Sequence, residues 1–135
     1  MPTVIFACIH NAGRSQMAAA WFQRLADPAK ARAISAGTRP AERVHPEVQA
    51  AMLEAGIDLS GARPRKLTAE LAAGAARLFT LGCGEECPAI PGVPVEDWPL
   101  PDPKGQGIDA VRGIRDEVRR RVEALLRREG WAARS

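Results

Sequence analysis

Short apolar runs alternate along the chain with longer amphipathic stretches. Residues 3–7 form a compact, partly β-branched run, which predicts a buried parallel strand. Residues 31–35, closed by Gly37, and residues 77–81 predict two more strands of the same kind. The short run at 93–95 predicts a fourth strand near an edge of the sheet, because Pro94 has no N–H to donate to a ladder.

Helical spacing of apolar residues predicts helices over residues 15–25, 46–55, 67–73 and 108–128. Ser15 is the predicted N-cap of the first helix. Pro46 suits the first turn of the second helix, and Gly56 suits its end. The last helix is strongly amphipathic. Its predicted core positions are Val111, Ile114 or Arg115, Val118, Val122 and Leu125.

Strands that alternate with helices indicate an α/β fold. The predicted architecture is a three-layer sandwich, with a four-stranded parallel sheet covered by helices on both faces. The length of 135 residues fits a single domain over residues 1–135, with residues 130–135 expected to fray.

Composition narrows the classes of function. The sequence shows no apolar run long enough to span a membrane and no signal peptide, so we expect no membrane association and a cytoplasmic location. The net charge is +3, but the arginines of the last helix are interspersed with acidic residues, and aromatic residues make up only 4%. These features favour a solvated helix face over a nucleic-acid-binding surface.

The loop between the first strand and the first helix carries the strongest chemical signal. It places Cys8 at the end of a strand and Arg14 at the start of a helix, where free N–H groups and the helix dipole stabilise a thiolate and an oxyanion. The expected catalytic residues of this loop are Cys8, Arg14 and Ser15. The expected oxyanion-binding residues are Ile9, His10, Asn11, Ala12, Gly13 and Arg14.

Three residues of this loop have more specific predicted roles. Gly13 permits backbone conformations that turn N–H groups inward, and Asn11 is expected to hold the loop through its side chain. The Ser15 hydroxyl is expected to donate to the Cys8 thiolate as well as to cap the helix. For His10, the favoured interpretation is a solvent-facing residue that contributes only its N–H, and the alternative is a side chain that tunes Cys8.

A second pair of thiols, Cys83 and Cys87, follows the predicted strand at 77–81 and so lies at the same edge of the sheet as Cys8. Structural zinc would need further ligands, and the chain offers only His10 and His45, without the spacing of a zinc motif. We therefore expect no metal site. Two thiols separated by three residues can reach disulfide distance if their loop moves, which favours a redox role.

Taken together, these motifs resemble a known family. The Cys-x5-Arg-Ser loop followed by Gln16-Met17-Ala18 resembles the phosphate-binding loop of the low-molecular-weight protein tyrosine phosphatases. Three further features make the chain more similar to the three-cysteine, thioredoxin-coupled arsenate reductases built on that fold. These are Ser35-Ala36-Gly37, the stretch from Asp97-Trp98 to Asp102-Pro103, and the late cysteine pair.

The resemblance implies a reaction. Cys8 attacks arsenate while Asp102, presented by a proline-rich loop, donates a proton to the leaving oxygen. Cys83 then attacks Cys8 and releases arsenite, and Cys87 attacks Cys83. The resulting disulfide is reduced by thioredoxin, with no bound cofactor. The loop is also expected to accept phosphate and sulfate, and Asp97 is expected to be a structural turn residue.

Three alternatives remain open at the level of the sequence. A tyrosine phosphatase shares the loop, but such enzymes usually carry aromatic residues near the Asp-Pro pair, whereas this chain has no tyrosine and continues as Lys104-Gly105-Gln106. An arsenate transferase that uses mycothiol or glutathione can dispense with Cys83 and Cys87. A sensor of arsenic or oxidants would need the cysteines but neither Asp102 nor Arg14.

Overall fold

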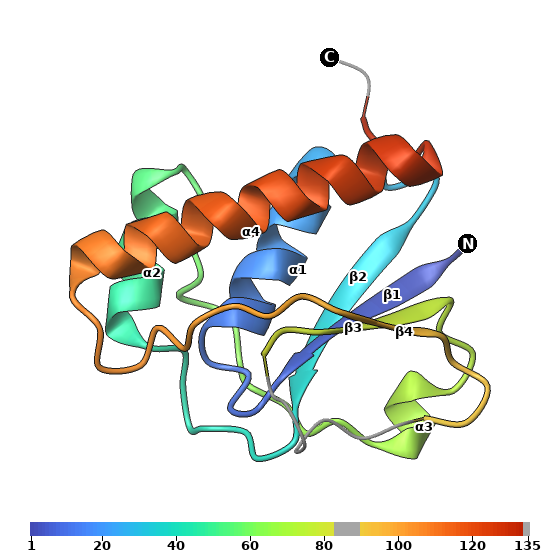
Figure 1. Ribbon diagram of the computed structural model, residues 1–135, viewed down its shortest axis with the longest axis horizontal. Helices are drawn as coiled ribbons and strands as arrows, with labels where there is room; N and C mark the ends of the chain where they lie inside the picture. Colours follow the sequence, from blue (N-terminus) through green and yellow to red (C-terminus); the bar gives the residue numbers. More distant parts are fainter. Residues whose placement is uncertain (83–89, 134–135) are drawn as a thin grey trace.

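The computed structural model describes residues 1–82 and 90–133 (Figure 1). Its strands are β1 (Thr3–Cys8), β2 (Arg32–Gly37), β3 (Arg77–Thr80) and β4 (Val95–Asp97), and its helices are α1 (Arg14–Leu25), α2 (Pro46–Glu54), α3 (Ala69–Ala72) and α4 (Ile108–Glu129). The predicted cysteine pair, Cys83 and Cys87, lies outside the described residues.

The four strands form one sheet in the order β2-β1-β3-β4, and every pair is parallel. This confirms the predicted four-stranded parallel sheet. The fourth strand is displaced from its predicted position, because it spans Val95–Asp97 rather than 93–95. Pro94 contributes its carbonyl to the Leu78 N–H at 2.9 Å but has no N–H to continue the ladder, and β4 lies at the edge as predicted.

Alternate residues of β1 supply two separate apolar clusters, one on each face of the sheet. Val4 and Phe6 belong to the larger cluster, which also contains buried residues of α1, α2 and α4. Ile5 and Ala7 belong to a smaller cluster with residues of the 67–72 region around α3. Helices therefore cover both faces, as predicted, but α3 is a single short turn and covers its face thinly (Figure 1).

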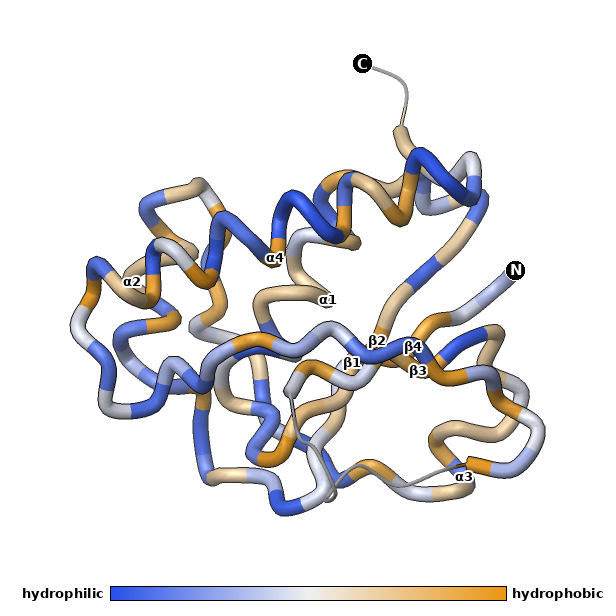
Figure 2. Tube along the Cα trace, in the orientation of Figure 1, coloured by the Kyte–Doolittle hydropathy of each residue, from blue (hydrophilic) through white to orange (hydrophobic). Residues whose placement is uncertain are grey.

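Helix α4 turns one apolar stripe toward the core and a charged face outward (Figure 2). The predicted inward positions are buried, and the open choice between Ile114 and Arg115 falls to Ile114. The Arg115 guanidinium instead donates to the carbonyl of Ala51 at 2.8 Å and contacts Glu54 at the end of α2. None of the described helices is both long enough and apolar enough to cross a membrane.

Residues 130–133 are the part of the chain beyond α4 that the structure describes, and they lie against α1; the expected fraying over 130–135 stays a prediction. Gly130 ends the helix in the left-handed conformation, with φ +73°. The ring of Trp131 then packs edge-on against Phe22, at 6.2 Å between centroids. The carbonyl of Trp131 accepts from Asp27, and Ala132 bridges to Ala26. This segment thus makes an aromatic contact with α1 that the local sequence pattern does not reveal.

Candidate active site

Cys8 ends β1 and is buried, with 2% of its surface exposed. Its Sγ lies 2.9 Å from the Oγ of Ser15, in the first turn of α1. The same Oγ accepts a hydrogen bond from the Asn11 side-chain amide at 2.7 Å. The bond from Asn11 leaves the hydroxyl proton of Ser15 free, and when Cys8 is a thiolate that proton can be donated to the sulfur, which stabilises the charge.

The loop over residues 9–13 turns its carbonyls away from Cys8. The carbonyls of residues 8, 9, 10 and 12 accept from backbone N–H groups of residues 38, 39, 41 and 45. Those of Asn11 and Gly13 accept from the Gln16 side chain and the Met17 N–H. No described residue accepts a hydrogen bond from the N–H groups of residues 9–13. The loop therefore presents, at the start of a helix, five donors without a partner in the described part of the chain, an arrangement suited to a bound anion.

Asn11 is the residue that sets this loop. Its φ is +50°, in the left-handed region that asparagine tolerates better than most side chains. Its Oδ1 accepts from the Arg65 N–H at 2.9 Å and from Gln16 Nε2 at 3.3 Å, while its Nδ2 donates to Ser15. The predicted structural role of Asn11 is therefore seen in full. The left-handed residue is Asn11 and not Gly13, whose φ is −141°.

Gly13 instead allows close contact with the loop that carries Asp102. A side-chain Cβ at Gly13 would lie 2.6 Å from Cγ of Pro103, so the Pro103 ring would have to move. Gly13 is also the N-cap of α1, which begins at Arg14. The prediction that Ser15 caps the helix is therefore wrong: Ser15 lies inside the first turn, and its hydroxyl points at Cys8 instead.

Arg14 is almost fully buried and is held by carbonyls from two distant segments. Its Nη1 donates to the carbonyl of Leu100 at 2.9 Å and to that of Gly82 at 3.3 Å. Gly82 has φ +84°, and a Cβ there would lie 2.6 Å from both Arg14 Nη1 and the Leu100 oxygen. Only glycine combines this backbone conformation with this close approach.

Asp102 lies next to Arg14, with its Oδ2 3.9 Å from Nη2. Its side chain is 42% exposed, and its Oδ1 accepts from the Lys104 N–H at 2.9 Å, which fixes the turn through Pro103. The predicted proton donor is thus at the loop, within reach of solvent and of a ligand. Asp97, expected to be a structural turn residue, ends β4 and accepts from the Thr80 hydroxyl at 2.7 Å.

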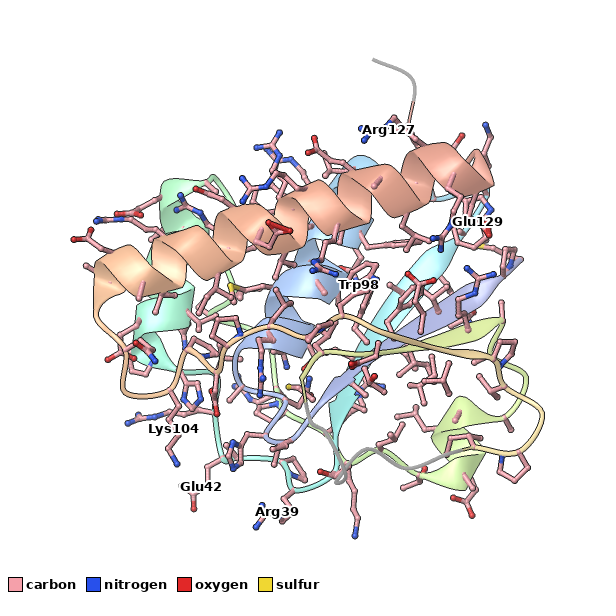
Figure 3. All side chains as sticks on the ribbon, viewed as in Figure 1. Arg39, Glu42, Trp98, Lys104, Arg127 and Glu129 are labelled. Carbon is pink, nitrogen blue, oxygen red and sulfur yellow. The ribbon has the colours of Figure 1, made fainter. Side chains whose placement is uncertain are left out.

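Two histidines border the same region. Burial lowers the pKa of His45 below its usual value, and the neighbouring Asp102 carboxylate opposes this shift while His10 and Lys104 add to it. The N–H of His45 donates to the loop carbonyl of Ala12. His10 is partly exposed, and its carbonyl accepts from the Ala41 N–H. In Figure 3, Lys104 and Arg39 lie along the lower edge of the molecule, on the opposite side from Arg127 and Glu129 at the end of α4.

Several residues that build this site were missed at the level of the sequence. Gln16 holds Asn11, Gly82 admits Arg14, and the backbone of residues 38–45 orients the loop carbonyls. Of these features, the turn at Gly82 has a signal in the local sequence, because a glycine that directly follows a predicted strand indicates a turn. Trp98 of the Asp97-Trp98 motif packs in the core: it is 5% exposed, and its ring centroid lies 4.8 Å from that of Phe79.

Comparison with known proteins agrees with this geometry. The model of the family "Low molecular weight phosphotyrosine protein phosphatase" matches residues 3–85. A relative from Halobacterium salinarum, provisionally named an arsenate reductase, is 39% identical over 90% of this chain and 88% of its own length. A "Glutaredoxin arsenate reductase" from Synechocystis sp. is 36% identical over 93% of this chain and 97% of its own.

A solved structure shows the same likeness in three dimensions. The thioredoxin-dependent arsenate reductase of Corynebacterium glutamicum superposes with a TM-score of 0.79 and 36% identity, over 94% of this chain. The match spans 61% of that longer chain. Sequence, fold and loop geometry thus lead to one assignment, and the chain belongs to the low molecular weight phosphotyrosine protein phosphatase family.

Proposed function

We propose that this protein reduces arsenate to arsenite, with Cys8 as the nucleophile. The observation that carries the proposal is the loop after Cys8: the five N–H groups of residues 9–13 have no acceptor among the described residues, Arg14 begins the following helix beside Asp102, and the Cys8 sulfur lies 2.9 Å from the Ser15 hydroxyl. Such a site binds a tetrahedral oxyanion and attacks its central atom. The arsenate reductases among its relatives favour arsenic as that atom.

In the first step the Cys8 thiolate attacks arsenic, and a sulfur–arsenic bond replaces an arsenic–oxygen bond. Asp102 gives its proton to the departing oxygen, which leaves as water. Arg14 and the loop N–H groups neutralise the charge on the remaining oxygens. The position of Asp102 beside Arg14, half open to solvent, suits a group that must regain a proton after each cycle.

Electrons then come from the other two thiols. Cys83 attacks Cys8, the sulfur–arsenic bond breaks, and its electron pair stays on arsenic, which leaves as arsenite. Cys87 attacks Cys83, so Cys8 returns to its thiolate and a Cys83–Cys87 disulfide remains. Thioredoxin reduces that disulfide by exchange, and the net reaction consumes one dithiol for each arsenate. The presence of Cys83 and Cys87 supports this relay, because an enzyme that used a small thiol as the electron donor would not need these two cysteines.

The first prediction concerns the nucleophile. Cys8→Ser should abolish arsenate reduction, because a serine hydroxyl at this position has no comparable nucleophilicity and forms no disulfide. The measurement is arsenate-dependent NADPH oxidation in the presence of thioredoxin and thioredoxin reductase. Asp109→Asn, a carboxylate change on the exposed face of α4, serves as the control and should leave the rate unchanged. Turnover by Cys8→Ser near that of the unmodified protein would refute nucleophilic catalysis by Cys8.

The second prediction concerns the relay. Cys87→Ser should release at most about one arsenite per protein. Cys83 can still attack Cys8 and release arsenite, but without Cys87 the Cys8–Cys83 disulfide is not exchanged for the Cys83–Cys87 disulfide that thioredoxin reduces. Arsenite released per protein is counted with thioredoxin and thioredoxin reductase present, where the unmodified protein should turn over repeatedly. Sustained turnover of this variant with mycothiol–mycoredoxin or with glutathione–glutaredoxin would replace the internal relay by a small-thiol mechanism.

A phosphatase is the second candidate, because the family name and the loop are shared. Phosphate can occupy the same donors, and a phosphorylated Cys8 can be hydrolysed by water. The site lacks the aromatic wall that would hold a phosphotyrosine ring, since the chain has no tyrosine and Trp98 is buried in the core. Fast hydrolysis of an aryl phosphate, with no arsenate reduction by any of the three donor systems, would favour the phosphatase.

A further inference from the structure

A cavity of about 390 Å³ lies behind the active-site loop, between α1, the outer edge of β2 and the segment over residues 59–65. Its volume falls in the lower part of the range found for small-molecule sites. The polar side chains that line it are Gln16 and Gln23 of α1, Ser35 of β2, and Arg63 and Arg65. The proposed reaction uses none of these side chains directly.

The edge of β2 presents free backbone groups to this cavity. At the C-terminal end of β2, Gly37 pairs with residues 65–67, which cover that part of the edge. The Ala33 carbonyl faces the same side, because it accepts from the Gln23 amide at 3.2 Å. Alternate residues of a strand direct their N–H and C=O groups to the same edge. The N–H groups of Ala33 and Ser35 therefore face the cavity, and no described residue accepts from either.

The charge around this cavity is entirely positive. No acidic side chain occurs among its lining residues, as far as the chain is described. Arg63 donates only to the carbonyls of Ser60 and Ala62, at 3.4 and 3.2 Å. The Arg65 side chain makes no ion pair or hydrogen bond with any described residue. Two guanidinium groups and two backbone N–H groups without a carboxylate partner favour an anionic ligand.

The spacing of the donors selects the kind of anion. The N–H groups of Ala33 and Ser35 are two residues apart on a strand, which separates them by about 6.6 Å. They cannot converge on one tetrahedral ion, as the N–H groups of the Cys8 loop can. A ligand with a carboxylate at each end satisfies both N–H groups, and a guanidinium binds a carboxylate through two parallel hydrogen bonds. We propose that this cavity binds a short dicarboxylate.

The cavity is joined to the nucleophile by a continuous set of hydrogen bonds. The Arg65 N–H donates to Asn11 Oδ1 at 2.9 Å, and Gln16 Nε2 bridges the carbonyls of Asn11 and Arg63 at 3.0 and 3.4 Å. Asn11 in turn donates to Ser15, which contacts Cys8. A ligand that fixes residues 63–65 would thereby hold Asn11 in its left-handed conformation and favour the anion-binding form of the loop. Dicarboxylate and oxyanion should then strengthen each other's binding.

Binding is tested by calorimetric titration of succinate and glutarate into the full-length protein at constant ionic strength, with acetate as the single-carboxylate comparison. Succinate or glutarate should bind saturably and more tightly than acetate. Arg65→Met should weaken this binding about tenfold, through loss of charge-assisted hydrogen bonds. Lys66→Met removes the same charge from the next residue, which is exposed like Arg65 but does not line the cavity, and should stay within about twofold. Absence of saturable binding, or equal loss in both variants, would overturn the proposal.

The coupling rests on the proposed oxyanion binding by the Cys8 loop, whereas dicarboxylate binding does not. It is measured as the affinity of the Cys8→Ser variant for inorganic phosphate, with and without saturating succinate. Succinate should tighten phosphate binding about threefold or more, and the effect should vanish in Arg65→Met. An unchanged phosphate affinity overturns the coupling alone. If succinate binds but phosphate does not bind at all, the proposed function is overturned and the dicarboxylate site stands.

Discussion

The Ser15 hydroxyl contacts Cys8, the proposed nucleophile, and does not cap its helix. Its Oγ is buried between Cys8 Sγ and the Asn11 amide, at 2.9 and 2.7 Å. A residue favoured at N-caps thus occupies the first turn of α1, where its polar group needs another partner. The contacts with Cys8 and Asn11 supply that partner, and helix capping does not account for the serine at this position.

Replacement of this hydroxyl should slow the reaction of Cys8 with an alkylating agent. In a background with Cys83 and Cys87 changed to serine, Ser15→Ala should reduce the rate of iodoacetamide modification at neutral pH about tenfold, because the thiolate loses a charge-assisted donor. Ser60→Ala, an exposed hydroxyl far along the chain, is the matched control. An alkylation rate equal to that of the control would show that Ser15 does not stabilise the thiolate.

Local sequence patterns predict the helices and strands of this fold, but they do not predict the long-range contacts that build the candidate active site. Apolar runs predict β1 and β3 closely, and helical spacing predicts the core face of α4. β4 lies two residues later than predicted because its position depends on pairing with β3. The contacts of Arg14 with Gly82 and Leu100 span 68 and 86 residues, so no local periodicity can reveal them. The same holds for Trp131 against Phe22.

The turn that follows β3 provides a direct test of such a long-range contact. Gly82→Ala places a methyl group 2.6 Å from Arg14 Nη1 and should displace the guanidinium. We expect weaker phosphate binding, and a loss of stability that exceeds the cost of a left-handed alanine by about 1–3 kcal/mol. Phosphate affinity by titration and the free energy of unfolding in urea measure the two effects.

Gly92 supplies the matched control for this turn. Its φ is +82°, nearly that of Gly82, but a Cβ there would meet nothing within 4 Å. Gly92→Ala should therefore cost only the left-handed backbone, about 1–2 kcal/mol, and should leave phosphate binding unchanged. If the two variants behaved alike, the close approach of Gly82 to Arg14 would have no functional consequence.

At the scale of the whole molecule, α4 is connected to the body by ion pairs near both ends, with its apolar stripe between them. Near its start, Arg112 and Arg115 contact Glu54 at the end of α2, at 2.6 and 3.2 Å. Near its end, Arg128 reaches Glu96 of β4 at 3.1 Å. These groups are partly exposed, so each pair is screened by salt and contributes modestly. Their effect is best seen through the dependence of stability on pH.

Glu54 is the residue for which the dependence of stability on pH can be predicted. The hydrogen bond from Arg112, more than any other contact, lowers the pKa of Glu54 from 4.5 to about 2. A carboxylate whose pKa is depressed by folding stabilises the protein above the unfolded value and loses that contribution as the pH falls through the folded one. The stabilisation from Glu54 should therefore be complete above about pH 5 and should decline between about pH 4.5 and pH 2.

Glu54→Gln tests this directly, because the amide keeps the shape of the side chain but does not titrate. Its melting temperature should lie below that of the unmodified protein at about pH 7, and the difference should shrink at about pH 3 and in 1 M NaCl. Glu42→Gln is the control, since Glu42 is exposed and makes no ion pair with any described residue. A difference that stayed constant from about pH 7 to pH 3 would mean that α2 and α4 are held together by apolar packing alone, with no net contribution from the Glu54 ion pairs.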